Sequence, residues 1–152
     1  MKREYPEGPI VGVGAVVFDD EAVLLVRRNQ DPARGQWSLL GGVVELGETL
    51  REAVERELRE ELSINVEIGG LIGVYDRIFR DRKNRIRYHY VLVDYWSNIL
   101  SGRPEANSDI SETQLVPLSN LNAFSINQEL RETIWKAVKL RNRTLQLNDR
   151  RV

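Results

Sequence analysis

The chain has 152 residues, with 22 basic and 23 acidic side chains, a formal net charge of −1 and no cysteine. This length favours a single domain over residues 1–152, large enough to bury a core without covalent staples. The balanced charge gives no support to binding of a nucleic acid polymer, and the lack of cysteine excludes disulfides and a thiol nucleophile. Because no apolar run reaches the length of a membrane span and residues 1–9 lack the apolar core of a secretion signal, we expect a cytoplasmic protein that does not enter a membrane.

The start of the chain predicts a β-hairpin after an irregular lead-in at about residues 1–9. The β-branched run over residues 10–18 is typical of a buried strand, and residues 22–28 predict its hairpin partner. Gly12 and Gly14 weaken the first strand, and glycines at such positions often mark a close approach of backbone or ligand.

The second strand ends in Arg27 and Arg28, which are candidates to contact an anionic ligand; solvated strand-end charges are the alternative. Residues 29–36 predict a loop by their proline, glycine and polar content. A short apolar segment, residues 37–40, then leads into two glycines.

An acidic helix over about residues 48–62 is the most informative stretch. At about 100° per residue its apolar side chains form one stripe. Glu57 and Glu61 fall inside this stripe, and Glu60 lies near its edge. Carboxylates turned toward the protein body are costly unless a cation meets them or protonation neutralises them. Hard oxygen ligands on a helix suit Mg²⁺ or Mn²⁺.

The rest of the chain carries strand, turn and helix signals in alternation. We expect strands on both sides of Gly69, Gly70 and Gly73 within residues 64–79, a turn over residues 80–84 and a long strand over residues 85–96. A long loop over residues 97–111 and a short strand over residues 112–117 follow. The chain is expected to end with a helix over residues 127–141 and a fraying polar tail at about residues 142–152. This order predicts an α/β architecture with a mixed β-sheet flanked by helices.

The stretch from Gly42 to Ile64 resembles the signature of the Nudix hydrolases. Gly42 is followed after five residues by Glu48, and seven residues later comes the run RELREELSI that starts at Arg56. One fixed position differs, because Ser63 replaces a glycine that usually ends the helix with a left-handed turn. The resemblance extends to the preceding strands, the Trp-x-x-x-Gly-Gly pattern and the terminal helix, and therefore implies a Nudix-type α/β/α sandwich.

The resemblance implies Mg²⁺- or Mn²⁺-dependent hydrolysis of a pyrophosphate bond in a nucleoside diphosphate linked to another group. ADP-ribose or a related nucleoside diphosphate sugar is the favoured substrate. By the same resemblance the metal ligands are expected to be the Gly41 carbonyl, Glu57, Glu60 and Glu61, and Arg56 is expected to pair with Glu48.

The general base is left open between two residues. Glu57 of the helix is one candidate, and Glu112 after the long loop, with Asp109 nearby, is the other. For Glu112, a plain strand-end charge is the competing interpretation.

Substrate contacts are predicted less sharply. The candidates are Arg27, Arg28, Trp37, Arg77 and Tyr88, with Tyr75 and Phe79 as further aromatic side chains that could stack on a nucleobase. Packing in the core or on a sheet face is the alternative for each aromatic residue. His89, the single histidine, is expected to be a packed strand residue and not a catalyst.

Two other functions compete with hydrolysis of a nucleotide sugar. The first is hydrolysis of a nucleoside triphosphate, including an oxidised one. The second is a non-catalytic Nudix module that senses a nucleotide, which the complete set of glutamates disfavours. The oligomeric state is left open, with a homodimer as one expectation.

Overall fold

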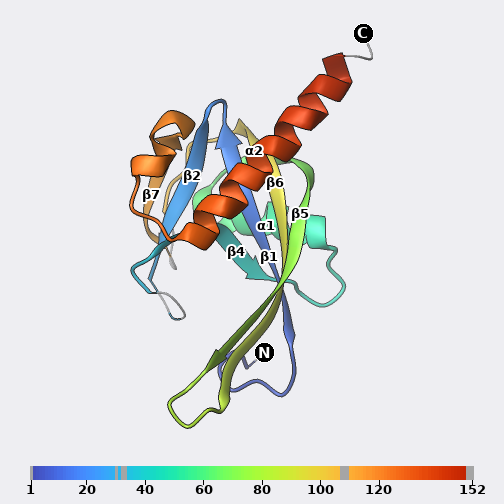
Figure 1. Ribbon diagram of the computed structural model, residues 1–152. Coiled ribbons are helices and arrows are strands. Elements are labelled where there is room, and N and C mark those ends of the chain that lie inside the picture. Colours follow the sequence, from blue (N-terminus) through green and yellow to red (C-terminus); the bar gives the residue numbers. More distant parts are fainter. Residues whose placement is uncertain (1, 30, 32–33, 107–109, 150–152) are drawn as a thin grey trace.

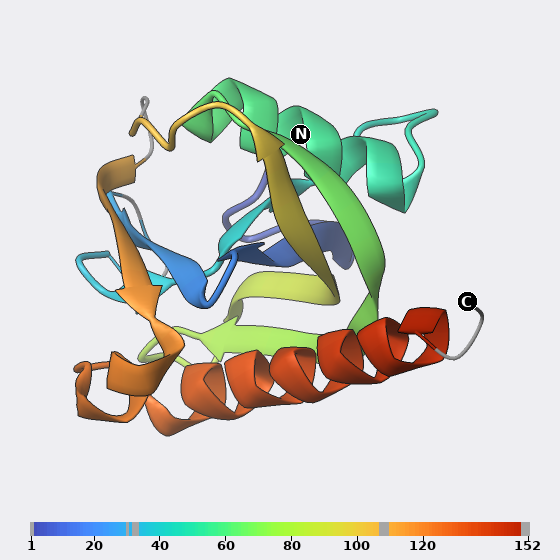
Figure 2. The ribbon, with the colours of Figure 1, turned by 90° about the horizontal axis from the view of Figure 1, so that it is seen from above.

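The computed structural model describes residues 2–29, 31, 34–106 and 110–149 (Figure 1). Its elements, in chain order, are β1 (Ile10–Asp19), β2 (Ala22–Arg28), β3 (Trp37–Ser38), β4 (Leu40–Val43), α1 (Leu50–Leu62), β5 (Asn65–Arg80), β6 (Ile86–Ser101), β7 (Ile110–Pro117), a 3₁₀ helix η1 (Leu118–Ala123) and α2 (Gln128–Asp149). Figure 2 shows α1 and α2 on opposite sides of the strands. The predicted mixed sheet between helices is confirmed.

Strand β1 organises the sheet because it pairs with three other strands. Along one edge it runs parallel to β6, from Ile10 opposite Tyr90 onward. The other edge is divided: its first half pairs antiparallel with β4, and its last residues form the predicted hairpin with β2. The sheet therefore forks beside the centre of β1, and β4 leads from the fork toward α1.

Successive side chains of β1 supply two separate cores, as expected for a strand buried on both faces. Val13, Ala15 and Val17 pack in the core beneath α1. Val16 and Phe18 point the other way and pack in the core beneath α2. The sheet is thus held firmly from both sides along the strand that carries the site.

Helix α1 has capped ends. The Thr49 hydroxyl accepts a hydrogen bond from the Glu52 backbone N–H at 3.2 Å and donates to the Glu52 carboxylate at 2.9 Å, an arrangement that satisfies a free helix-start N–H. At the other end Ser63 adopts φ 59°, so the left-handed turn is kept without glycine. A non-glycine residue is strained in this region.

Strands β5 and β6 form a long twisted ribbon that projects beyond the body of the molecule (Figure 1). We predicted strands on both sides of the glycines, and the structure has one continuous strand whose register shifts near them. The Trp96 ring explains one shift, because a Cβ at Gly69 would lie 2.2 Å from it. The N-terminal segment lies along the ribbon, where the Tyr5 hydroxyl donates to Asp81 at 2.8 Å.

Two boundaries differ from the prediction. The predicted loop over residues 97–111 starts later, because β6 continues to Ser101, held by β1 on one side and β5 on the other. Pairing on both edges overrides the weak strand propensity of Ser97 and Asn98. The predicted fraying tail is also wrong in part: α2 continues to Asp149, since no glycine or proline follows Arg141 to end it.

Among the described residues, neither helix is long and apolar enough to cross a membrane.

Candidate active site

A cavity of about 440 Å³ lies between α1 and the strand ends, and we call it the acidic cavity. Helix α1 contributes Glu57, Glu60 and Glu61 from one face, and the other described carboxylates of the lining are Glu4, Asp31 and Glu45. The exposure along α1 follows the predicted projection, with Glu57 and Glu61 partly buried and Glu60 exposed. Gly41 and Gly42 of β4 form part of the same lining.

The two glycines are required by close contacts. A Cβ at Gly42 would lie 2.1 Å from the carboxyl carbon of Glu57. A Cβ at Gly41 would lie 2.6 Å from the Val13 carbonyl oxygen, across the β1–β4 pair. Any side chain at Gly42 would therefore push the Glu57 carboxylate out of its position against the backbone.

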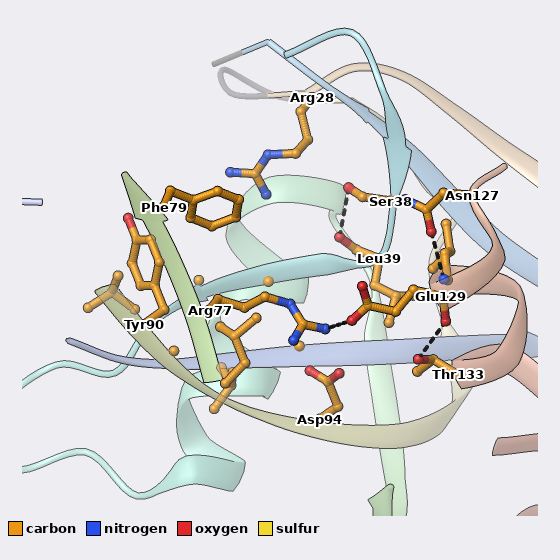
Figure 3. Close-up of a pocket in the computed structure, with 18 of the residues that line it drawn as sticks. Arg28, Ser38, Leu39, Arg77, Phe79, Tyr90, Asp94, Asn127, Glu129 and Thr133 are labelled. Atoms are coloured by element: carbon orange, nitrogen blue, oxygen red, sulfur yellow. Dashed lines mark hydrogen bonds and ion pairs between the residues drawn. The ribbon is translucent and has the colours of Figure 1, made fainter. Parts of the chain in front are cut away.

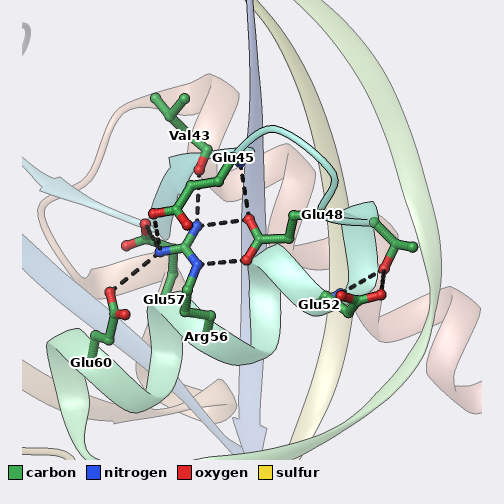
Figure 4. A network of polar contacts seen from close by, with 8 residues as sticks. Val43, Glu45, Glu48, Glu52, Arg56, Glu57 and Glu60 are labelled. Atoms are coloured by element: carbon green, nitrogen blue, oxygen red, sulfur yellow. Dashed lines mark hydrogen bonds and ion pairs between the residues drawn. The ribbon is translucent and has the colours of Figure 1, made fainter. Parts of the chain in front are cut away.

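Arg56 holds the start of α1 together (Figure 4). Its guanidinium donates to both oxygens of Glu48, at 2.6 and 2.9 Å, and to the Val43 carbonyl at 3.0 Å. The remaining terminal nitrogen donates to Glu57 at 2.8 Å and to Glu60 at 3.3 Å. The Arg56–Glu48 pair expected from the resemblance is present, and it connects the helix to the end of β4.

The carboxylates of this network are affected in opposite ways. Hydrogen bonds from Arg56, and then from the Glu45 backbone N–H, lower the pKa of Glu48 to about 2. Burial raises the pKa of Glu57, the nearby charges of Glu61 and Glu60 raise it further, and Arg56 opposes the shift. Glu48 is therefore a fixed charge, whereas Glu57 is a desolvated carboxyl at the cavity wall.

The residues of the acidic cavity suit a hard divalent cation by type, since they offer carboxylate oxygens and a backbone carbonyl. Within the described part of the chain, however, no three acidic or histidine side chains are already gathered around a metal position. Arg56 accounts for this, because its guanidinium takes the place of a cation between Glu57 and Glu60.

A second cavity, of about 290 Å³, shares the Gly41–Gly42 wall, and we call it the apolar slot (Figure 3). Its apolar lining comes from several elements and includes Leu39, Phe79, Leu92 and Leu130. Its charged groups are Arg3, Arg28, Arg77, Asp94 and Glu129, counted among the described residues. Arg28 also lines the acidic cavity, so it lies where the two meet.

Three of the five predicted substrate residues line a cavity. Arg28 lines both, Arg77 lines the apolar slot and is paired with Glu129, and Tyr88 lines the acidic cavity. Tyr88 donates a hydrogen bond to Glu4 at 3.0 Å and is stacked on Tyr90 at 6.3 Å between ring centroids.

Trp37 and Arg27 take other places. Trp37 contacts the Phe124 ring edge-on at 5.6 Å, and the Arg27 guanidinium lies 4.7 Å from the Trp37 ring centroid. Neither residue belongs to the described lining of the two cavities. The geometry favours the packing alternative for Trp37.

Glu112 is also placed outside the two cavities as far as the described lining extends. It lies on β7 opposite Arg27 of β2, and the two side chains form an ion pair at 2.8 Å. Asp109, named beside it in the sequence, falls outside the described residues.

Asp94 is the site residue that the sequence reasoning missed. It is 7% exposed, lies on β6 and lines the apolar slot. The signal was present, because Asp94 interrupts the apolar run VLVDYW and Gly14 is its partner on β1. A single acidic residue in a buried strand, paired with a glycine on the neighbouring strand, indicates a carboxyl group that has a defined position.

Comparisons with known proteins agree with this geometry. The NUDIX domain model matches residues 8–136. An ADP-ribose pyrophosphatase of Methanocaldococcus jannaschii is 32% identical over 121 residues, which cover 80% of this chain and 69% of the relative. The chain spans less than half the length of the next curated relatives that it matches.

Solved structures share the fold. A MutT NUDIX hydrolase from Burkholderia pseudomallei is 30% identical with a TM-score of 0.71, over 86% of this chain and 98% of that one. The NUDIX domain of Shewanella oneidensis NrtR, solved with ADP ribose, is 22% identical with a TM-score of 0.67, over 88% of this chain and 89% of that one. The signature from Gly42 to Ile64, the sandwich fold and the domain match together establish that this chain belongs to the Nudix hydrolase family.

Proposed function

We propose that this chain hydrolyses the pyrophosphate bond of a nucleoside diphosphate linked to another group, with Mg²⁺ or Mn²⁺, and that its substrate is ADP-ribose or a related nucleoside diphosphate sugar. The observation that carries this proposal is the pair of cavities on either side of Gly41 and Gly42. One is lined by carboxylates and the other by apolar side chains. A ligand that joins a clustered negative charge to a flat apolar ring matches both halves.

The acidic cavity repels a pyrophosphate unless cations lie between them. Nudix hydrolases generally use divalent metal ions. Here the Gly41 carbonyl, Glu57, Glu60 and Glu61 would hold such ions, which neutralise the phosphates and lower the pKa of bound water. The half-buried Glu57 supports this, because it shares the single Arg56 guanidinium with Glu48 and Glu60, and burial still raises its pKa.

The protein's own groups have separate tasks in the proposal. Arg56 and Glu48 fix the start of α1 against Val43, which orients the glutamates of the next turns. Attack of water on phosphorus requires a carboxylate to take up a proton. Glu57 lies in the cavity wall, whereas Glu112 is paired with Arg27, so the geometry favours the helix as the source of the base.

The similarity to a MutT NUDIX hydrolase, of which the chain covers 98%, keeps a nucleoside triphosphate as the second candidate substrate. It would use the same acidic cavity, with pyrophosphate as the leaving group.

A panel of nucleoside diphosphate sugars and nucleoside triphosphates, each incubated with Mg²⁺ or Mn²⁺, tests the proposal. We expect ADP-ribose to give AMP and ribose 5-phosphate. Release of a nucleoside monophosphate and pyrophosphate would establish the triphosphate reaction instead. No turnover of any member with either metal would contradict both, and binding without turnover would point to a sensing module.

A further inference from the structure

The Asp94 carboxyl lies in the apolar slot because its neighbours leave room for it (Figure 3). Its partner on β1 is Gly14, and its partner on β5 is Gly73. A Cβ at Gly14 would lie 2.3 Å from Oδ1 of Asp94. The glycine thus allows the carboxyl to lie over β1 and line the slot.

No hydrogen bond to this carboxyl is found among the described residues, although the side chain is buried. The charged groups that face it are Arg77 from β5 and Glu129 from α2, which are paired with each other. Arg3 and Arg28 are the other charged groups of the slot within the described residues, and Tyr90 adds a phenol. Because the carboxyl lines the slot without a hydrogen-bond partner in the described part of the chain, its hydrogen-bonding groups are open to a ligand there.

Burial raises the pKa of Asp94 to about 6; Arg77 opposes the shift and Glu129 adds to it. The carboxyl is therefore partly neutral just below pH 7. A ligand that excludes water from the slot would favour the neutral form further, because it removes solvent from the charge.

A neutral carboxyl presents an O–H donor beside a C=O acceptor. Adenine presents the complementary pair, since its amino group donates beside a ring nitrogen that accepts. Hypoxanthine presents the same pair in reverse, an oxygen that accepts beside a ring N–H that donates, so a neutral carboxyl matches it as well. A purine ring without the 6-amino group keeps the acceptor and loses the donor. The guanine Watson–Crick edge, with adjacent donors, would instead match an ionised carboxylate.

We propose that Asp94 is a specificity-determining residue that binds the amino edge of adenine, with the adenine ring held among Phe79, Leu39 and Leu130 of the apolar slot. This inference rests on the proposed function for the choice of adenine and for the direction in which the nucleotide lies. A slot of about 290 Å³ is at the small end of ligand pockets and suits one ring system.

Calorimetric binding of AMP and of purine riboside 5′-monophosphate, which lacks the amino group, to the full chain tests the proposal without requiring turnover. We expect AMP to bind about 3-fold to 10-fold more tightly, as for the loss of one hydrogen bond. AMP affinity should fall as the pH rises from 5.5 to 8, because the neutral carboxyl is lost above a pKa of about 6.

Two variants separate the role of Asp94 from a structural one. Asp94→Asn keeps a donor beside an acceptor, so it should retain AMP binding and lose the pH dependence that wild type shows. Asp94→Leu should bind AMP and purine riboside 5′-monophosphate equally. Asp76→Asn, on the exposed side of β5, is the matched control and should behave as wild type.

Equal binding of AMP and purine riboside 5′-monophosphate by the wild type would overturn the inference, as would tighter binding of GMP that improves with rising pH. Turnover of ADP-ribose without discrimination between AMP and purine riboside 5′-monophosphate contradicts this inference alone. Discrimination without any turnover contradicts the proposed hydrolysis and leaves the adenine contact in place. If the thermal midpoint of Asp94→Leu is lowered, the test rests on Asp94→Asn. Loss of the pH dependence of AMP binding in Asp94→Asn supports the inference, and a pH dependence equal to that of the wild type contradicts it.

Discussion

The two halves of the cleft treat their carboxyl groups in opposite ways. Beside the acidic cavity Glu48 receives two hydrogen bonds from Arg56, and its pKa falls to about 2. In the apolar slot Asp94 has no such partner among the described residues, and burial raises its pKa to about 6. A hydrogen-bonded guanidinium thus outweighs burial at Glu48, whereas burial outweighs the more distant charge of Arg77 at Asp94.

This contrast suggests a division of labour. The acidic half gathers several carboxyl groups along α1, as expected where phosphate charge has to be met through cations. The apolar half holds one buried carboxyl among apolar side chains, as expected where a neutral ring has to be recognised. Gly41 and Gly42 line both halves, so one ligand can contact both.

The largest effect should come from Glu57→Gln, which removes a charge from the acidic wall and keeps the shape. We expect kcat to fall by about 10²-fold to 10⁴-fold, the range for loss of a positioned catalytic carboxylate. Steady-state kinetics with ADP-ribose and Mg²⁺ would measure it.

Glu55→Gln is the matched control, because Glu55 lies on α1 but is exposed and outside the described lining of the acidic cavity.

Glu112→Gln should stay near the wild-type rate if the base belongs to the helix. A large loss in the chemical step for Glu112→Gln, with substrate binding preserved, would move the base to β7.

Glu48→Gln should have the next largest effect, on stability. It removes the charge and turns one of the two acceptor oxygens that Arg56 uses into an NH₂ donor, in a pair whose side chains are 16% and 12% exposed. We expect the free energy of unfolding to fall by about 1–3 kcal/mol, measured by urea denaturation at pH 7.

The same pair predicts a pH dependence. Because the folded-state pKa of Glu48 is depressed to about 2, its contribution is present above the ordinary carboxyl pKa and is lost as the pH falls toward about 2. The stability gap between wild type and Glu48→Gln should therefore narrow between pH 5 and pH 3. A gap that stays constant over this range would show that Arg56 does not stabilise the ionised form.

Gly14→Ala should have a smaller effect, confined to the apolar slot. The new methyl group would meet the Asp94 carboxyl, which has to move away from β1. We expect KM for ADP-ribose to rise roughly fivefold to tenfold with little change in kcat, as for a weakened base contact. A fall in kcat with an unchanged KM would mean that the methyl group disturbs β4 and the acidic wall instead.

The smallest effect should come from Ser63→Gly at the end of α1. Glycine relieves the left-handed backbone at φ 59° but loses more freedom on folding, so a net gain of about 0.5–1 kcal/mol in unfolding free energy is expected. Thermal denaturation would detect it, and the kinetics with ADP-ribose should not change. A loss of activity would show that the helix end adjusts the acidic wall.

Local signals were enough to predict the acidic helix, its inward glutamates and the first hairpin. Their periods and spacings are encoded within a few neighbouring residues. The apolar slot was not predictable in this way, because it brings together Gly14, Phe79 and Asp94 from three strands and Leu130 from the last helix. The extension of β6 to Ser101 was missed for the same reason, since partners distant in sequence hold it.

The parallel pairing of β1 with β6 has a consequence for folding. Gly14 and Asp94 both line the apolar slot and are far apart in the chain. This part of the slot forms only when β1 and β6 are paired. Pairing of strands that are distant in sequence costs the entropy of closing a long loop before their contacts form, so it tends to occur late in folding. A chain still being synthesised can complete the β1–β2 hairpin and α1 before β6 is available. Nucleotide binding should therefore report on the fully folded chain, with little signal from partly folded forms.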